Sequence, residues 1–368
     1  MKRVLFMIPN LGHGGAEKVL VNLVNHMDKN KFDITVMTLY DEGVNKSSLS
    51  SEIRYLSCFK RSFLGVAHLL KLVSPEKLYS WFVKDEYDIV ISYLEGQTAR
   101  IVSGCKNPNT KLVSWIHCTM NKSSDLSVLF RNLNEAIDSY GSMDTMVFVS
   151  EDVKDSFLNV SKYSGTTRVL YNTLDSSKIK ELSNHPLYYE IKKDKFNLIG
   201  VGSLKEVKGF LRLLHVVRKL NDLYPVHLYI LGEGPQRNEL ETYISKHELN
   251  STVTLIGYDE NPYKHVSKCD LFVCSSYSEG FSTAATEALI VGTPVCTVEV
   301  SGMNEMLGKD SEYGLIVENN EDALFDGIKK LIEDKELYCH YREKAVERGQ
   351  FFSSEETVKA VEEMLLNL

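Results

Sequence analysis

The sequence predicts an α/β protein made of two doubly wound domains, each with a mostly parallel sheet, that face a central cleft. Three observations favour this fold class. The chain has 368 residues, more than one domain of roughly 150 residues requires. Short runs rich in Val, Ile and Leu alternate with amphipathic stretches almost throughout both halves of the chain. Near-continuous apolar strands separated by helices are typical of parallel strands covered on both faces.

The elements follow the same order in both halves, which favours two Rossmann-like domains. In the first half we expect strands at 4–8, 32–39, 87–93, 111–116 and 145–150, and helices at 16–27 and 151–160. In the second half we expect strands at 196–204, 226–232, 251–258, 269–276, 293–300 and 312–318. A polar, Lys-rich segment separates the two patterns. We therefore expect domains at 1–190 and 191–350, and a helix at 351–368 that packs back on the first domain.

Composition and charge exclude several classes of protein. The net charge of -8 disfavours a nucleic-acid-binding protein, which normally has a basic excess. The seven cysteines are odd in number and form no C-x-x-C pair, which is typical of free thiols in a reducing compartment. The first apolar run ends at Pro9, and no run approaches the roughly 18 apolar residues of a membrane span. We expect a cytoplasmic protein.

The first glycine loop, PNLGHGGAEKVL at 9–20, resembles a dinucleotide fingerprint without completing it. Its third glycine position holds Glu17, although Asp41 lies where a ribose-binding acid would stand. This disfavours a nicotinamide or flavin site. Gly14 and Gly15 still permit an anion to approach the amides at the start of a helix, and a simple tight turn remains the alternative.

Two loops of the second half also follow strands. VGSLKEVKGF at 201–210 places Lys208 at the start of a helix, where a lysine and free amides suit a diphosphate. A solvated lysine beside a turn is equally consistent with this loop. The loop ILGEGPQRNELE at 230–241 is more typical of a plain strand-to-helix turn.

The stretch SEGFSTAATEAL at 278–289 has two carboxylates around a small, hydroxyl-rich turn. Glu279 lies in the loop after an expected strand, and Glu287 lies about one turn into a helix capped by Ser282 or Thr283. One carboxylate can bind sugar hydroxyls and the other a ribose diol, with phosphate at the helix start between them. Alternatively, both acids complement the helix dipole.

Taken together, the motifs resemble those of glycosyltransferase family 4, whose members are retaining enzymes with two Rossmann-like domains (GT-B) that use nucleotide sugars. The resemblance covers essentially the whole chain. Its motifs are Glu279-x7-Glu287, GTPV (292–295), SGMNE (301–305), GGAE (14–17), SWIH (114–117), VSE (149–151), VLYN (169–172), VGSLKEVKGF and LGEGP (231–235).

The resemblance implies roles for particular residues. It implies catalytic roles for His117, near the transferred sugar, and Glu279, at its hydroxyls. It implies that the donor is bound by Gly15, Ser203, Lys208, Tyr258 beside Gly257, the backbone of Gly280, Phe281 and Ser282, the amides of Thr283, Ala284 and Ala285, and Glu287 at the ribose. Ser203 stands where the family usually has arginine, which predicts weaker donor binding unless Lys205 substitutes. Thr173 stands where proline is common, and we expect little consequence.

The resemblance also implies the reaction. We expect retaining, metal-independent transfer of a hexose or N-acetylhexosamine from a nucleotide sugar, most commonly a UDP-sugar, with no further cofactor. The expected acceptor is a lipid-linked or other oligosaccharide in surface polysaccharide (capsule) biosynthesis.

The segment 59–84 mixes basic, aromatic and apolar residues. It predicts either a peripheral contact with the inner face of the cell membrane or a helical pair packed on the sheet. Two other functions stay open: a catalytically weak partner subunit that acts by binding, for which Ser203 is the only support, and a nucleotide-sugar epimerase.

Overall fold

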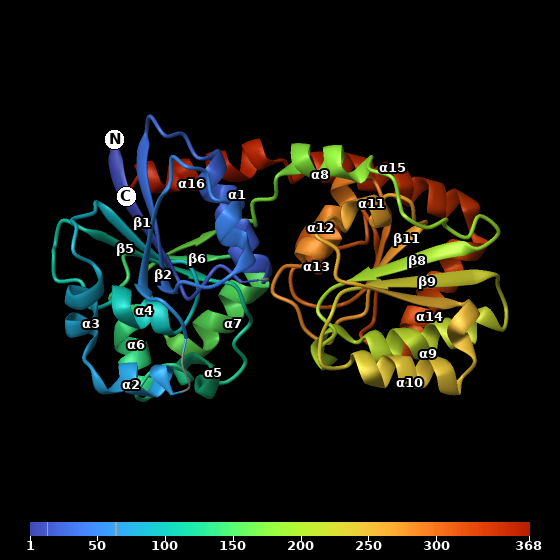
Figure 1. Cartoon of the computed structure of the whole chain (residues 1–368), viewed down its shortest axis with the longest axis horizontal. Helices are drawn as coiled ribbons and strands as arrows, with labels where there is room; N and C mark the ends of the chain where they lie inside the picture. The colour runs from blue at the N-terminus through green and yellow to red at the C-terminus, as the bar shows by residue number, and fades with distance from the viewer. Residues whose placement is uncertain (13, 63–64) are drawn as a thin grey trace. The chain divides into compact units, whose positions relative to one another are not determined.

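The protein divides into two compact units. The computed structural model describes residues 1–12, 14–62 and 65–368. Unit 1 comprises Met1–Leu174 and Ser354–Leu368, and unit 2 comprises Asp175–Ser353. The boundary therefore falls after Leu174, whereas the sequence pattern placed it after residue 190. Each unit is a parallel sheet with helices on both faces (Figure 1), which confirms the predicted fold class of two doubly wound α/β domains.

Unit 1 contains a seven-stranded parallel sheet in the order β3-β2-β1-β4-β5-β6-β7. Strand β1 pairs with β2 and β4, so that Leu5 lies opposite both Thr35 and Val90. The strands are β1 (Lys2–Ile8), β2 (Phe32–Tyr40), β3 (Arg54–Phe59), β4 (Ile89–Ser92), β5 (Lys111–Ile116), β6 (Thr145–Phe148) and β7 (Thr166–Val169). The edge strands β3 and β7 were not predicted, because exposed polar residues interrupt both and neither forms a continuous buried apolar run.

The helices of unit 1 include the last helix of the chain. They are α1 (Gly15–His26), α2 (Val66–Leu72), α3 (Pro75–Phe82), α4 (Gln97–Val102), α5 (Ser123–Ser127), α6 (Leu133–Gly141), α7 (Glu151–Ser161), α16 (Ser354–Leu366) and the 3-10 turn η1 (Val44–Ser48). Helix α16 lies beside α1 (Figure 1). Lys2 Nζ donates to the Leu365 carbonyl at 3.0 Å, and the Asp28 amide donates to Glu362 Oε1 at 2.6 Å. These bonds tie the end of the chain to its beginning.

Unit 2 contains a six-stranded parallel sheet in the order β10-β9-β8-β11-β12-β13. Its strands are β8 (Phe196–Val201), β9 (Val226–Leu231), β10 (Val253–Gly257), β11 (Leu271–Cys274), β12 (Val295–Val298) and β13 (Leu315–Val317). Its helices are α8 (Ser176–Ser183), α9 (Phe210–Asn221), α10 (Arg237–Lys246), α11 (Tyr263–Val266), α12 (Thr283–Ile290), α13 (Met303–Leu307), α14 (Glu321–Glu333) and α15 (Lys335–Phe351), with turns η2 (Glu206–Lys208) and η3 (Leu249–Ser251).

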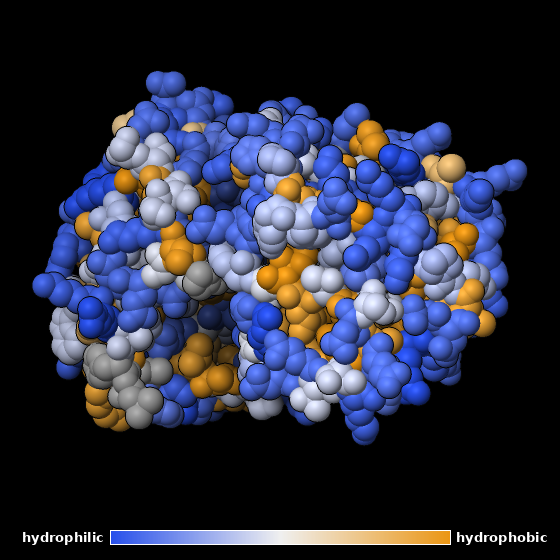
Figure 2. Space-filling view, turned by 45° about the vertical axis from the view of Figure 1, so that its right-hand side comes forward, coloured by the Kyte–Doolittle hydropathy of each residue, from blue (hydrophilic) through white to orange (hydrophobic). Residues whose placement is uncertain are grey.

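The central strands are buried on both faces. All six residues of β9 are buried, as are Val4 to Ile8 of β1, because helices cover both sides of each sheet. The face seen in Figure 2 is, by contrast, largely hydrophilic. Among the described residues, no helix has both the length and the apolar character needed to cross a membrane.

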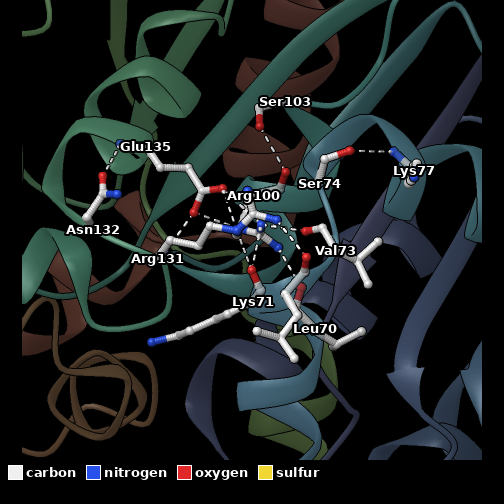
Figure 3. Close-up of polar contacts among 11 residues, drawn as sticks. Leu70, Lys71, Val73, Ser74, Lys77, Arg100, Ser103, Arg131, Asn132 and Glu135 are labelled. Carbon is white, nitrogen blue, oxygen red and sulfur yellow. Dashed lines mark hydrogen bonds and ion pairs between the residues drawn. The ribbon is translucent and has the colours of Figure 1, made fainter.

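A buried arginine fixes the position of helix α2 in unit 1 (Figure 3). Arg100 on α4 is 2% exposed, and it forms two hydrogen bonds of 2.9 Å with the carboxylate of Glu135. Arg131 also donates to the end of α2. Since the last carbonyls of a helix have no partner within it, these arginines replace the missing donors. Arg100 donates to the carbonyls of Leu70 (2.9 Å), Lys71 (3.4 Å) and Val73 (2.7 Å).

We expect Glu135→Ala to lower the free energy of unfolding of unit 1 by about 3 kcal/mol, because it leaves the buried Arg100 charge without its carboxylate. Urea denaturation measured by tryptophan fluorescence checks this, since Trp81 and Trp115 both lie in unit 1. The matched control is Asp85→Ala, which removes the exposed ion pair with Arg54 and should cost less than about 1 kcal/mol. Equal shifts for the two variants would contradict the prediction.

Candidate functional site

The candidate site of unit 2 lies where the strand order reverses. Strands β8 and β11 are adjacent in the sheet but are separated in the chain by β9 and β10. Open parallel sheets bind ligands at the carboxyl ends of the strands at such a position. The loop after β8 carries Lys208, and the loop after β11 carries Glu279. The two motifs predicted from the sequence are therefore brought to the same edge of the sheet.

Lys208 and Glu279 form a direct ion pair. Lys208 Nζ donates to both carboxylate oxygens of Glu279, at 2.7 and 2.9 Å. The side chain of Glu279 is 9% exposed and that of Lys208 is 27% exposed. Ser276 also donates a hydrogen bond to Glu279. A lysine paired in this way compensates the buried carboxylate and remains accessible to an anion from solvent.

The two loops contact each other through their backbones. Gly209 has φ +65°, and a Cβ at this position would lie 2.0 Å from the Ser275 carbonyl oxygen. The Ser275 hydroxyl donates to the Lys208 carbonyl at 3.1 Å, and the Tyr277 amide donates to the Val207 carbonyl at 2.7 Å. Only glycine permits this approach. The position of Lys208 relative to Glu279 thus depends on Gly209.

Sequence reasoning missed Arg212, which contacts the loop after β11 from its buried side. This residue on α9 is buried and donates to the carbonyls of Ser275 and Ser276, both at 2.6 Å, and to Asn319 Oδ1 at 2.7 Å. Its guanidinium lies over the ring of Tyr277, 4.2 Å from the centroid. The signal in the sequence was a charged residue within the otherwise apolar buried stripe of α9.

Ser203 and Lys205 are exposed in the loop after β8. This loop contacts the next one, because a Cβ on Gly232 (φ +142°) would lie 1.9 Å from the Gly202 carbonyl oxygen. The Leu204 amide also donates to the Glu233 carbonyl at 3.0 Å. These contacts fix the backbone on both sides of Ser203.

Helix α12 begins with the predicted cap. Ser282 Oγ accepts a hydrogen bond from the Ala285 amide at 3.4 Å, so that amide already has a partner within the protein. Thr283 and Ala284, which precede it, are partly exposed. Phe281 is buried, with its ring 5.8 Å from that of Phe352.

Glu287 projects from α12 into a buried polar contact. It is 7% exposed, and its Oε1 accepts a hydrogen bond from the Tyr263 hydroxyl at 3.2 Å. Tyr258, expected at the nucleotide base, is exposed in the loop after β10. Sequence reasoning did not identify Tyr263.

In unit 1, His117 directly follows β5 and is buried. Burial lowers the pKa of His117 to about 3, although a hydrogen bond with the Tyr93 backbone opposes this, so the imidazole is neutral at pH 7. Its Nε2 is buried and has no hydrogen-bond partner among the described residues. The His117 amide donates to Glu95 Oε2 at 3.1 Å. Burial raises the pKa of Glu95, a residue that sequence reasoning missed.

The first glycine loop is shaped by its own glutamate. The Glu17 carboxylate lies over Gly14 at the start of α1, where a Cβ would be 2.1 Å from Glu17 Oε2. Gly15, the first residue of α1, is exposed. Asp41 accepts hydrogen bonds from Lys46 (2.5 Å) and from the Tyr55 hydroxyl (2.8 Å), which further disfavours a ribose role for Asp41.

The described part of the chain contains neither a cluster of metal ligands nor a disulfide. Over 1–12, 14–62 and 65–368, no group of three or more His, Cys, Asp or Glu residues is arranged to hold a metal ion. The seven cysteines are free thiols.

Two family models match the chain in succession. The model for Glycosyltransferase Family 4 matches residues 13–178, and the model for Glycosyl transferases group 1 matches residues 188–348. The second match contains the Lys208–Glu279 pair and Glu287.

The chain is also similar to curated bacterial proteins along nearly its whole length. It is 28% identical to the N-acetylgalactosamine-N,N'-diacetylbacillosaminyl-diphospho-undecaprenol 4-alpha-N-acetylgalactosaminyltransferase of Campylobacter jejuni subsp. jejuni serotype O:2, with 96% of each chain covered. It is 23% identical to the lipopolysaccharide core biosynthesis glycosyltransferase LpsE of Rhizobium meliloti, with 92% of each chain covered.

Among solved structures, the fold is similar to that of HepE from Anabaena in complex with UDP and glucose. The TM-score is 0.79 at 18% identity, and both chains are covered completely. Sucrose-phosphate synthase from Thermosynechococcus elongatus gives a TM-score of 0.79 at 17% identity, over 100% of this chain and 99% of the other.

We expect His117 to make the stability of unit 1 depend on pH. The folded-state pKa of about 3 lies below the ordinary value, so the unfolded chain takes up the proton first as the pH falls below about 6.5. Stability should then fall by up to about 1.4 kcal/mol per pH unit down to pH 5. His117→Gln should remove this part of the slope, as measured by urea denaturation at pH 7, 6 and 5. Identical slopes for both proteins would contradict the prediction.

Proposed function

The chain belongs to glycosyltransferase family 4, and we propose that this glycosyltransferase moves a hexose or N-acetylhexosamine from a UDP-sugar to a lipid-linked or other oligosaccharide acceptor in surface polysaccharide biosynthesis. One observation carries the proposal: Lys208 and Glu279 meet at the strand-order reversal of unit 2, within the segment that the group 1 model matches. At this edge of the sheet, the Lys208 cation suits the diphosphate of a nucleotide sugar and the Glu279 carboxylate suits the hydroxyls of its sugar.

The ion pair suggests how the donor is received. The leaving group is a nucleoside diphosphate, whose negative charge must be stabilised as the glycosidic bond breaks. Lys208 turns from Glu279 to the phosphate oxygens, and Glu279 becomes available to accept hydrogen bonds from the sugar hydroxyls. Binding of the diphosphate by Lys208 thereby frees the Glu279 carboxylate to bind the sugar.

The positions of the side chains support the remaining donor contacts that we propose. Glu287 binds the ribose hydroxyls, and the exposed Tyr258 lines the base. Because Phe281 is buried, the stretch Gly280–Ser282 contacts the sugar through its backbone. In unit 1, a neutral His117 that donates to the Tyr93 backbone has an acceptor lone pair on Nε2. We assign that lone pair to a hydroxyl of the transferred sugar.

We propose that transfer proceeds with retention and without a metal ion. The acceptor oxygen bonds to the anomeric carbon on the face from which the diphosphate oxygen leaves, and a donor phosphate oxygen takes the acceptor's proton. Lys208 and the start of α12 stabilise the departing phosphate charge, and Glu279 orients the sugar rather than attacking it. NMR of the product tests this: an anomeric configuration opposite to that of the donor would refute retention.

The acceptor proposal draws on the Campylobacter jejuni relative, whose name specifies an undecaprenyl diphosphate-linked substrate. A lipid-linked acceptor requires the protein to approach a membrane. Segment 59–84 suits such an approach, because helices α2 and α3 expose Leu69 (55%), Leu72 (78%) and Trp81 (54%). The same segment contains the exposed Lys60 and Arg61. Phe63 and Leu64 of this segment lie outside the described residues. We propose a peripheral contact with the cytoplasmic face of an anionic membrane.

We expect Lys208→Ala to weaken UDP binding by roughly 10- to 100-fold, the loss of one or two charge-assisted hydrogen bonds. Titration calorimetry in EDTA measures this and also tests metal independence. The matched control is Lys219→Ala, an exposed lysine on α9 paired with Asp322, which should bind UDP as the wild type does. Unchanged affinity in Lys208→Ala would refute the site.

A thermal-shift panel of the wild type with UDP, GDP, ADP and NAD identifies the nucleotide. A selective rise with UDP supports the proposed donor, and a selective rise with another diphosphate corrects it. If no nucleotide raises the melting temperature, the alternative of a partner subunit that acts by binding is favoured.

We expect replacement of Lys60, Arg61 and Lys71 by glutamine to weaken binding to phosphatidylglycerol-containing vesicles by roughly a hundredfold, at about 1 kcal/mol per cation. Co-sedimentation with anionic and with zwitterionic vesicles measures this. The control replaces Lys330, Lys335 and Arg342 of unit 2, which removes the same net charge. An equal loss in both variants would indicate a general charge effect, and no loss in either would refute the membrane contact.

A further inference from the structure

We propose that Tyr263 is a positioning residue for Glu287 and that, through Glu287, it makes the site select a ribonucleoside diphosphate over its 2′-deoxy analogue. This inference rests on the proposed role of Glu287 at the ribose. It adds a residue from another helix and a specificity that this residue controls.

The contact itself is buried on both sides. Tyr263 is 4% exposed and Glu287 is 7% exposed, and the tyrosine hydroxyl donates to Glu287 Oε1 at 3.2 Å. A carboxylate has two oxygens that can each accept more than one hydrogen bond. With Oε1 bonded to Tyr263, rotation of the Glu287 side chain is restricted and Oε2 is held in one direction.

Helix α11, which carries Tyr263, is itself held in place. His265 is completely buried, and its two ring nitrogens lie 2.8 Å from Asp259 Oδ2 and 2.8 Å from the Tyr189 hydroxyl. Lys264 Nζ lies 2.9 Å from the same Asp259 oxygen. A helix of four residues would not be stable alone, so these contacts determine where the Tyr263 hydroxyl points.

The hydrogen bonds of α11 also connect Glu287, the proposed ribose-binding residue, with Tyr258, the proposed base-binding residue. Asp259 directly follows Tyr258 in the loop after β10. On the other side of α11, the Thr293 hydroxyl, beyond the end of α12, donates to the Val266 carbonyl at 2.9 Å. Hydrogen bonds and an ion pair therefore hold the loop after β10, helix α11 and the end of helix α12 together. Within this group of elements, the Tyr263 hydroxyl contacts the Glu287 carboxylate.

A fixed carboxylate explains selectivity for ribose. The 2′ and 3′ hydroxyls of a ribose are neighbouring donors, and both can donate to one carboxylate. A site built to hydrogen-bond a hydroxyl discriminates against an analogue that lacks it, because the buried acceptor is left unpaired. If Glu287 could rotate freely, ordering it would cost side-chain entropy on binding, and part of the discrimination would be lost.

The test measures the Kd of UDP and of 2′-deoxy-UDP by titration calorimetry for the wild type and three variants. In the wild type we expect UDP to bind about tenfold or more tightly than 2′-deoxy-UDP. Tyr263→Phe, which removes only the hydroxyl, should reduce this ratio to about threefold or less. Glu287→Gln should also reduce it. The matched control, Tyr338→Phe, removes a hydroxyl that donates to the Asp270 carbonyl at 3.2 Å in the same unit, and it should keep the wild-type ratio.

The outcomes separate the inference from the function on which it rests. If Glu287→Gln lowers the ratio and Tyr263→Phe does not, the positioning role of Tyr263 is overturned while the ribose role of Glu287 stands. If the ratio stays at the wild-type value in Glu287→Gln, or if the wild type does not distinguish the two nucleotides, the ribose role fails and the inference fails with it. A ratio that falls equally in Tyr338→Phe overturns the inference as a general effect of losing a hydroxyl.

Discussion

The candidate site depends on the close backbone contact between the loops that follow β8 and β11. Gly209 lies so near the Ser275 carbonyl that a Cβ would overlap it, and Arg212 holds the carbonyls of Ser275 and Ser276 from the buried side. Main-chain groups in contact leave little freedom to the side chains that follow. Lys208 Nζ consequently lies within hydrogen-bond distance of both carboxylate oxygens of Glu279, and these hydrogen bonds are charge-assisted.

The buried charges of the protein are compensated in two different ways. Arg100 is enclosed and paired with Glu135 and with three carbonyls at the end of α2, so its charge serves the structure of unit 1. Lys208 keeps part of its surface exposed, so its ammonium group can be reached from solvent. Burying an ion without a partner is costly, and His117 avoids this cost by staying neutral. The exposure of Arg100, Lys208 and His117 thus decides whether each is enclosed as an ion pair, charged and accessible, or neutral.

The residues that could not be identified from the sequence share one feature. Arg212, Glu95 and Tyr263 contact their partners across loops or between helices, and none stands in a motif with a recognisable spacing. The Tyr263–Glu287 contact, for example, joins residues from two helices flanking β11 and its loop. Short-range patterns of hydrophobicity report which face of an element is buried, but they do not report which polar side chains meet there.

The sequence by itself determined the parallel α/β class, most of the strands, the loops that carry the glycines and acids, and the family resemblance. These features are local: apolar runs, helix caps and turn residues depend on neighbours within a few positions. Only the tertiary structure decided the strand order, the boundary after Leu174, the edge strands β3 and β7, and the pairing of Lys208 with Glu279. Those features arise from packing between segments far apart in the chain. The sheet order that places β8 beside β11 selects which of the many glycine loops become neighbours.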